Sequence, residues 1–197
     1  MKILAIRLKN LASLAGPFEI DFTAEPLASA GLFAITGPTG AGKSTLLDAL
    51  CLALFGAVPR LSNAQMSAKA PDADGEISTG DPRTLLRRGT GEGYAEVDFV
   101  GIDGRRYRAR WEANRAREKA GGKLQASRQS LRDIDQDQLL ASQKVDFKTQ
   151  LEAVLGLNFE QFTRAVLLAQ SEFSAFLKAN DNERSELLEK LTDTALY

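Results

Sequence analysis

The chain has 197 residues, of which 44% are apolar and 26% are charged, and this suits one globular domain of ordinary size with a continuous core. Its 25 basic and 26 acidic side chains give a net charge of −1, so overall charge neither favours nor excludes a polyanionic partner. Histidine is absent, which excludes histidine bases, catalytic triads and histidine metal ligands. The single cysteine, Cys51, cannot form an intrachain disulfide, and no secretory or membrane-spanning segment is evident, so we expect a cytoplasmic protein.

Two half-buried strands are predicted at the start of the chain. Apolar and polar side chains alternate over residues 2–8 and again over residues 18–22, which is the period of a strand with one covered face. Residues 10–17 between them supply turn-forming side chains. The pattern therefore predicts an opening antiparallel pair of strands joined by a turn.

A phosphate-binding loop is the most specific motif in the chain. Residues 37–44 read Gly-Pro-Thr-Gly-Ala-Gly-Lys-Ser. They follow a short apolar run, residues 32–35, which is typical of a central strand covered on both faces. Leucines then recur at helical spacing until Gly56 and Pro59 end the pattern. Strand, loop and helix in this order are the context that such a loop requires, so the sequence predicts nucleotide binding.

Each residue type in this loop has a chemical reason. The glycines let successive backbone N–H groups turn toward phosphate oxygens, and the positive end of the following helix adds to the attraction. Lys43 is expected to act catalytically at the β- and γ-phosphates, and the Ser44 hydroxyl is expected to coordinate Mg²⁺. The residues predicted to contact the nucleotide are Gly37, Pro38, Thr39, Gly40, Ala41, Gly42, Lys43, Ser44 and Thr45.

The middle of the chain is predicted to be mainly strands and loops. Residues 60–93 are rich in Ser, Ala, Asp, Gly and Pro with little periodicity, so they are expected to form a long, partly mobile surface connection. Alternation returns at residues 95–99 and 107–111 on either side of a turn, which predicts a β-hairpin. An exposed loop at 114–124 and a third strand at 125–134 complete the predicted antiparallel sheet.

Three helical segments are predicted toward the end of the chain, and their ends can be read from capping residues. No repeat or heptad pattern long enough for a coiled coil is present. The expected caps are Asp146 at the start and Gly156 at the end of the first helix, Asn158 with Gln161 before the second, and Asn180 with Glu183 before the third.

A basic stretch lies in and after the hairpin. Residues 105–128 contain nine basic side chains and two acidic ones. Arg106, Arg108 and Arg110 share the strand face opposite the apolar residues, so they are expected to face solvent, where they could contact DNA phosphates. An ordinary solvated sheet face followed by a flexible loop explains the same pattern.

Three separate blocks of the chain, residues 2–11, 33–49 and 162–177, closely resemble the N-terminal ATPase segment of bacterial SbcC. That family consists of SMC-like ATPases of DNA double-strand-break repair, related to ABC-type ATPase heads. Residues 183–197 also look like the stretch leading into the family's long coiled coil. The resemblance implies an α/β P-loop NTPase fold, in which residues 1–197 form the N-terminal lobe of an ABC/SMC-type head. Its expected parts are strands, loop and first helix at 1–60, an antiparallel β subdomain at 94–134, and a helical segment with the Q-loop at 145–197.

The resemblance adds two site residues and two cofactors. Gln170 matches the Q-loop glutamine, which implies a catalytic role and a place in the Mg²⁺ shell. Asn10, flanked by Lys9 and Ser13, matches a loop that lies against the nucleotide. Some relatives have an arginine in this loop where Ala12 stands, so that arginine's phosphate contact is lost here. The implied cofactors are ATP and Mg²⁺.

The resemblance also implies partners, because only half of a head is present. The Leu-Ser-Gly-Gly signature, the acidic Walker B strand with its catalytic glutamate, and the switch histidine do not occur in these residues. We therefore expect the isolated chain to bind nucleotide without turning it over. The implied partners are the C-terminal lobe of the same protein, a second head in an ATP-dependent dimer, an SbcD-like nuclease and double-stranded DNA ends, with no membrane. Together they would use ATP binding and hydrolysis to clamp DNA ends and gate cleavage.

Two other classes of protein fit parts of the pattern. An SMC-like structural DNA clamp or chromosome organiser would use the same head without a nuclease partner. A self-contained P-loop kinase or GTPase is disfavoured because no second acidic strand motif and no guanine-specificity motif is found. Asp98 and Asp103, the acids nearest a strand end, lie in the hairpin, and a solvated strand face explains Asp98 better than a catalytic strand does.

Overall fold

The structure is a computed structural model that describes residues 1–62, 68–73 and 75–165. The chain divides into two units, Met1–Gly156 and Leu157–Tyr197, and each is described by itself. None of the helices in the described ranges is long and apolar enough to cross a bilayer.

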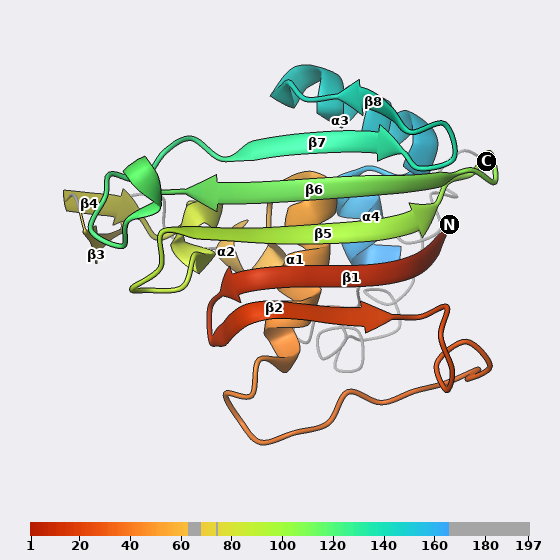
Figure 1. Ribbon diagram of the computed structural model, residues 1–197, viewed down its shortest axis with the longest axis horizontal. Coiled ribbons are helices and arrows are strands. Elements are labelled where there is room, and N and C mark those ends of the chain that lie inside the picture. Colours follow the sequence, from red (N-terminus) through yellow and green to blue (C-terminus); the bar gives the residue numbers. More distant parts are fainter. Residues whose placement is uncertain (63–67, 74, 166–197) are drawn as a thin grey trace, which may run out of the picture. The chain divides into compact units, whose positions relative to one another are not determined.

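One antiparallel sheet of six strands organises the first unit, in the order β2-β1-β5-β6-β7-β8 (Figure 1). The predicted opening pair, hairpin and third strand are confirmed. However, β1 pairs with β5 along most of its length, so the opening strands and the predicted β subdomain belong to one continuous sheet. The strands are β1 (Lys2–Leu11), β2 (Leu14–Asp21), β5 (Glu92–Val100), β6 (Arg106–Asn114), β7 (Arg128–Asp133) and β8 (Gln138–Ala141).

The turn between β1 and β2 is tighter than the sequence predicts. Pairing continues to Leu11 opposite Leu14, which leaves only Ala12 and Ser13 between the strands. Pro17 pairs opposite Lys9 within β2. Proline is tolerated there because β2 is an edge strand of the sheet in this part of the chain, so no neighbour needs its missing N–H.

Helix α1 (Lys43–Phe55) packs against the apolar face of the sheet, across β1, β5 and β6 (Figure 1). Side chains of this face are among the most deeply buried of the described chain, including Leu8, Val97 and Trp111. Apolar burial of this kind is the main favourable contribution to folding, so the sheet holds α1 and the loop before it in a fixed place. The opposite face of the sheet carries the charged residues.

The apolar run 32–35 is not a strand, and the predicted central strand is wrong for the described chain. Leu32, Phe33 and Ile35 have exposed fractions of 93%, 48% and 45%. A strand covered on both faces needs hydrogen-bonded neighbours and helices above and below it. In the described residues this run pairs with neither edge strand of the six-stranded sheet, β2 or β8, so it lacks the hydrogen-bonded neighbours of a central strand.

Residues 60–93 contain more regular structure than predicted. A two-stranded antiparallel sheet, one short helix and a 3₁₀ turn fall within or beside this segment. The four-residue strands β3 and β4 contain Pro71 and Gly75, which read as turn signals in the sequence, so the pattern misses them. The elements are α2 (Pro59–Ser62), β3 (Lys69–Asp72), β4 (Gly75–Ser78) and η1 (Pro82–Leu85).

The described helix ends agree with the predicted caps in two of three places. Gly156 ends α3 (Lys144–Leu155) in the left-handed conformation, as predicted. Asp146 is not its cap: the helix begins earlier, after Gln143, and Asp146 lies in the first turn, where its charge suits the positive helix end. Asn158 and Gln161 exchange hydrogen bonds of 2.9 and 3.0 Å at the start of α4 (Phe159–Ala165), which confirms that capping box. The pair Asn180 and Glu183 lies outside the described residues.

Helix α3 packs against β7 and β8 and so belongs to the first unit rather than to a separate helical segment. The predicted loop 114–124 contains one 3₁₀ turn, η2 (Ala116–Glu118), and an isolated antiparallel bridge between Arg115 and Leu124.

Candidate nucleotide-binding site

The phosphate loop joins the exposed run 32–35 to α1, and its backbone bends through left-handed conformations. Gly40 and Gly42 have φ angles of +84° and +91°, which a residue with a Cβ rarely adopts. Gly42 is also the N-cap residue of α1. The loop therefore depends on glycine at these two positions for its shape.

The N-terminus of α1 is open to an anion. No side chain caps it and no acidic residue lies in its first turn, although the helix is 13 residues long. The first amide groups of a helix have no partner within the helix, and the helix dipole adds partial positive charge at this end. A glycine loop in front of such an end is the physical requirement for phosphate binding, and nucleotide contact by these residues stays a prediction.

Lys43 bends back over the loop. Its ammonium group donates hydrogen bonds of 2.7 Å to the carbonyl of Gly37 and 2.9 Å to the carbonyl of Pro38. The charge therefore lies on the loop itself, where phosphate oxygens are expected to bind. Ser44 beside it is exposed, so its hydroxyl is available to a metal ion, whereas Thr45 is buried with an exposed fraction of 6%. A contact from Thr45 to the α-phosphate stays a prediction.

The turn between β1 and β2 lies against this loop. A Cβ placed on Gly42 would come within 2.7 Å of Leu14 Cδ2, so the two segments are in tight contact. Asn10 fixes the turn from within: its amide donates to the Glu92 carbonyl at 2.9 Å, and its Oδ1 accepts from the Gly16 N–H at 3.2 Å. The structure thus brings the predicted nucleotide loop to the phosphate loop, but it uses the Asn10 side chain to hold the turn.

Gln170 lies outside the described residues, so the structure does not place the predicted Q-loop. The other predicted nucleotide-binding residues are described: Gly37 to Thr45 form one continuous segment, and Asn10 lies near the end of β1.

Sequence reasoning missed one buried charge on α1. Asp48 has an exposed fraction of 6% and pairs with Arg60 of α2, with Nη2 and Oδ2 2.6 Å apart. Burial raises the pKa of Asp48, and the Arg60 charge opposes this effect. The pair ties α1 to α2, and a single polar residue within the leucine-rich helix was the available sequence signal. Burial likewise raises the pKa of Cys51 to about 12, so this thiol is an unreactive core group.

The predicted basic stripe lies on the charged face of the sheet, where carboxylates of neighbouring strands neutralise it. Arg108 donates to both carboxylate oxygens of Asp98 at 2.7 and 2.8 Å. Arg110 lies 3.1 Å from Glu96 and 4.1 Å from the centre of the Tyr94 ring, and Arg106 pairs with Asp135. The stripe is therefore an ion-pair network rather than a free cationic surface.

Asp98 is the centre of this network. Burial alone would raise the pKa of Asp98, but hydrogen bonds from Arg108 and Arg7 outweigh burial and hold the pKa below its usual range. Arg7 also bonds to Glu19 at 2.7 Å, so the network extends across four strands, β2, β1, β5 and β6. Asp103, the other acid near a strand end, accepts a 2.7 Å hydrogen bond from the Tyr107 hydroxyl within the β5–β6 turn. Both acids therefore have structural partners.

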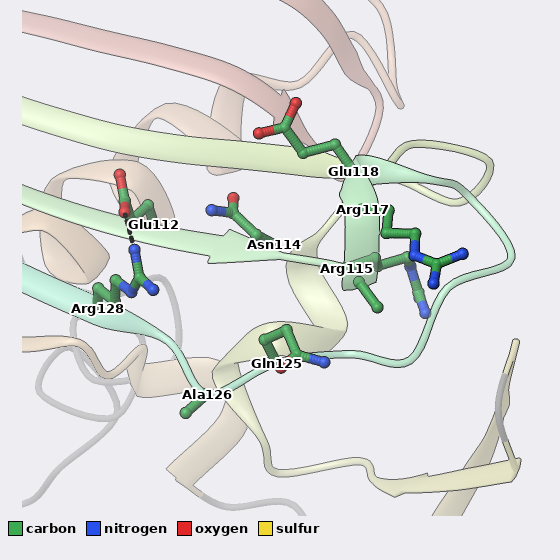
Figure 2. Close-up of a pocket in the computed structure, with 9 residues that line it drawn as sticks. Glu112, Asn114, Arg115, Arg117, Glu118, Gln125, Ala126 and Arg128 are labelled. Carbon is green, nitrogen blue, oxygen red and sulfur yellow. Dashed lines mark ion pairs between the residues drawn. The ribbon is translucent and has the colours of Figure 1, made fainter.

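A hollow of about 590 Å³ lies beyond the stripe, at the end of β6 (Figure 2). Figure 2 shows Glu112 paired with Arg128 at its rim, with 4.0 Å between the charged atoms. Arg115, which also lines it, is bonded to Asp72 of β3. This hollow mixes charges of both signs and has no geometry that selects one ligand.

Comparison with known proteins identifies the family of the chain. A family model described as an AAA domain matches residues 5–197, and the chain belongs to this family, which makes it a nucleotide-binding P-loop domain. It is 72% identical over 198 residues to a protein from Pseudomonas aeruginosa that is named as the C subunit of the nuclease SbcCD. Proteins of the same name from Rhodobacter capsulatus and Clostridium acetobutylicum are 57% and 31% identical over 198 and 199 residues.

These matches cover 100% of the chain, and they confirm its resemblance to the ATPase-head segment of SbcC. The chain spans only 16% of the length of the first two relatives and 15% of the third.

Proposed function

We propose that this chain is the ATP-binding half of an SbcC-like ATPase head. With a C-terminal lobe and an SbcD-like nuclease, the full protein would use ATP binding and hydrolysis to clamp DNA ends and gate their cleavage in the cytoplasm. The observation that carries the proposal is the uncapped N-terminus of α1 behind the glycine loop, with Lys43 already folded onto that loop. The names of the relatives support the nuclease complex.

Mg²⁺ fits this donor set, because the exposed Ser44 hydroxyl follows directly after the lysine in the first turn of α1. When bound, Mg²⁺ would supply positive charge that offsets the phosphate charge. In this proposal Ser44 holds the ion, Lys43 binds the β- and γ-phosphates, and Gln170 completes the metal shell.

The exposed apolar run 32–35 supports a second lobe. Leu32, Phe33 and Ile35 are large apolar side chains that are exposed to solvent. Such exposure is unfavourable in a folded protein. Their continuous apolar sequence suits a strand buried on both faces, and β2 offers a free sheet edge in the described chain. We propose that the C-terminal lobe supplies the missing cover. Two such heads would then enclose ATP between them.

The test is made on the full-length protein. We expect it to co-purify with a metal-dependent nuclease and the complex to cleave linear DNA ends in a manner that depends on hydrolysable ATP. The isolated residues 1–197 serve as the control: they should bind nucleotide but show no turnover above background, because the opposing catalytic groups belong to the second lobe. Magnesium-dependent hydrolysis by the isolated chain would contradict the shared site. A full-length protein that holds DNA without any nuclease would favour the SMC-like clamp.

DNA contact through Arg106, Arg108 and Arg110 is a separate proposal. Replacing all three with glutamine should make the slope of log affinity against log salt less steep by about 1 for each phosphate contact that is lost. Glutamine is preferred to glutamate, because new carboxylates would lie beside Glu96 and Asp98. Lys148→Gln on α3 is the control for a lost surface charge. An unchanged slope in the assembled complex would remove these arginines from the DNA interface.

A further inference from the structure

The β1–β2 turn is held in a conformation that its sequence does not favour. Asn10 and Ala12 have φ angles of +54° and +46°, although neither is glycine. Residues with a Cβ adopt the left-handed region at a cost, alanine more so than asparagine. Such a conformation persists only where surrounding contacts enforce it.

A segment more than seventy residues away supplies those contacts. The Ala12 N–H donates to the Leu85 carbonyl at 2.8 Å, and the Arg87 N–H donates to the Asn10 carbonyl at 2.9 Å. Leu11 and Leu86, both buried, form an isolated antiparallel bridge between the two segments. The backbone of residues 85–87 therefore lies along the outside of the turn and fixes its position.

The Arg87 side chain completes this contact. Its Nη1 donates hydrogen bonds of 3.2 Å to the Ala12 carbonyl and 2.7 Å to the Ser13 carbonyl. These two residues are the whole turn between β1 and β2. In the described part of the chain, these are the hydrogen bonds that the Arg87 guanidinium makes, so a permanent positive charge is used to hold two neighbouring backbone carbonyls.

The β1–β2 turn packs against the phosphate loop. Leu14, the first residue after the turn, lies so close to Gly42 that a Cβ there would be 2.7 Å from its Cδ2. Gly42 is the N-cap of α1, at the point where the loop passes into the helix. A chain of direct contacts therefore runs from Arg87 through the turn and Leu14 to the start of the anion-binding helix.

We propose that Arg87 is a positioning residue for nucleotide: its guanidinium holds the β1–β2 turn, through the Ala12 and Ser13 carbonyls, against the phosphate loop. It acts through the turn and touches no phosphate itself. Without it, the left-handed turn loses two of its bonds, Leu14 is no longer held against Gly42, and the loop loses its fixed starting point. This inference rests on the proposed nucleotide binding.

The experiment compares Arg87→Ala with Arg88→Ala in the full-length protein. Arg88 is the next residue, is exposed and makes no hydrogen bond to the turn among the described residues, so it controls for lost charge in this segment. Equilibrium binding of a fluorescent ATP analogue and thermal unfolding without nucleotide are measured on both variants. We expect Arg87→Ala to weaken nucleotide binding about tenfold, the size of one lost charge-assisted hydrogen bond, and Arg88→Ala to leave it unchanged.

Two further measurements separate positioning from general stability. Arg87→Lys, which keeps the charge but lacks the guanidinium fork, should bind with intermediate affinity, and it replaces Arg87→Ala if that variant fails to fold. Addition of millimolar guanidinium chloride to Arg87→Ala should restore part of the lost affinity, which a merely destabilised protein would not show. Equal affinity of Arg87→Ala and the unchanged protein, or an equal loss in Arg88→Ala, overturns the proposal. Failure of the unchanged protein to bind nucleotide would instead remove the proposed function.

Discussion

Replacing Lys43 with alanine is expected to weaken nucleotide binding by about a hundredfold while leaving the fold intact. The ammonium group lies on the phosphate loop, held only by the carbonyls of Gly37 and Pro38. In the proposed role of Lys43, a bound nucleotide would exchange those bonds for charge-assisted bonds to phosphate oxygens. Two such bonds at about 1.5 kcal/mol each correspond to roughly two orders of magnitude in affinity.

The fold should tolerate this change because Lys43 contributes nothing to the core. Both of its hydrogen-bond acceptors belong to its own loop, and no ion pair with it is found among the described residues. Lys148→Ala on α3 is the matched control, because its lysine is 78% exposed and far from the loop in sequence. Nucleotide affinity and thermal unfolding of the full-length protein are measured together. Retained affinity in Lys43→Ala, or a loss accompanied by unfolding, would contradict the assigned role.

The parts of the fold that the sequence predicts well are those whose partners are close in the chain. The hairpin of β5 and β6 pairs residues that are close in the chain, such as Asp98 with Arg108, and its alternating pattern is complete within a short window. The end of α3 at Gly156 depends on one residue and its φ angle. Local patterns of this kind indicate both the type of secondary structure and the segment with which it pairs.

The run 32–35 shows where this reasoning stops. Its apolar sequence predicts burial, but burial requires neighbours, and in the described residues the run is exposed and pairs with no strand of the sheet. The charged face shows the same limitation: Arg108 meets Asp98 within the hairpin, but Arg7 reaches the same Asp98 across 91 positions, and no local pattern indicates that contact. Register between distant strands is a tertiary property that no local pattern contains.

In the candidate site, too, the sequence predicts the short-range features and misses the long-range contacts. The loop, its lysine and the following helix are contiguous, and their geometry agrees with the motif. The bracing of the β1–β2 turn by Arg87 joins residues 74 apart, and its only local sign, alanine at a left-handed position, is invisible before the structure is known. Contacts that position a binding loop are therefore the part of a site most easily missed.

Gly42→Ala should reduce nucleotide binding below detection, whereas Gly40→Ala should lower the affinity only modestly. Both residues have positive φ angles, so a Cβ at either position costs about 1–2 kcal/mol of conformational strain. At Gly40 nothing lies within 4 Å of that Cβ, but at Gly42 it meets Leu14 Cδ2 at 2.7 Å and Leu14 Cγ at 2.8 Å. Since atoms this close cannot coexist, the Leu14 side chain or the β1–β2 turn that carries it must shift away from the start of α1.

A double-mutant cycle isolates that contact from the strain. Leu14→Ala removes the atoms that the new Cβ meets, so in the Leu14→Ala background Gly42→Ala should cost no more affinity than Gly40→Ala does in the unchanged protein. Nucleotide affinity is the readout, and urea unfolding of each variant shows how much of the loss is stability. Equal effects of the two glycine substitutions in the unchanged protein would mean that the loop depends on backbone freedom alone. The other outcome is a loss of affinity in Gly42→Ala alone that Leu14→Ala relieves. Because φ strain is common to both glycines and the steric contact is not, this result would establish that packing of the β1–β2 turn against the phosphate loop is required for nucleotide binding.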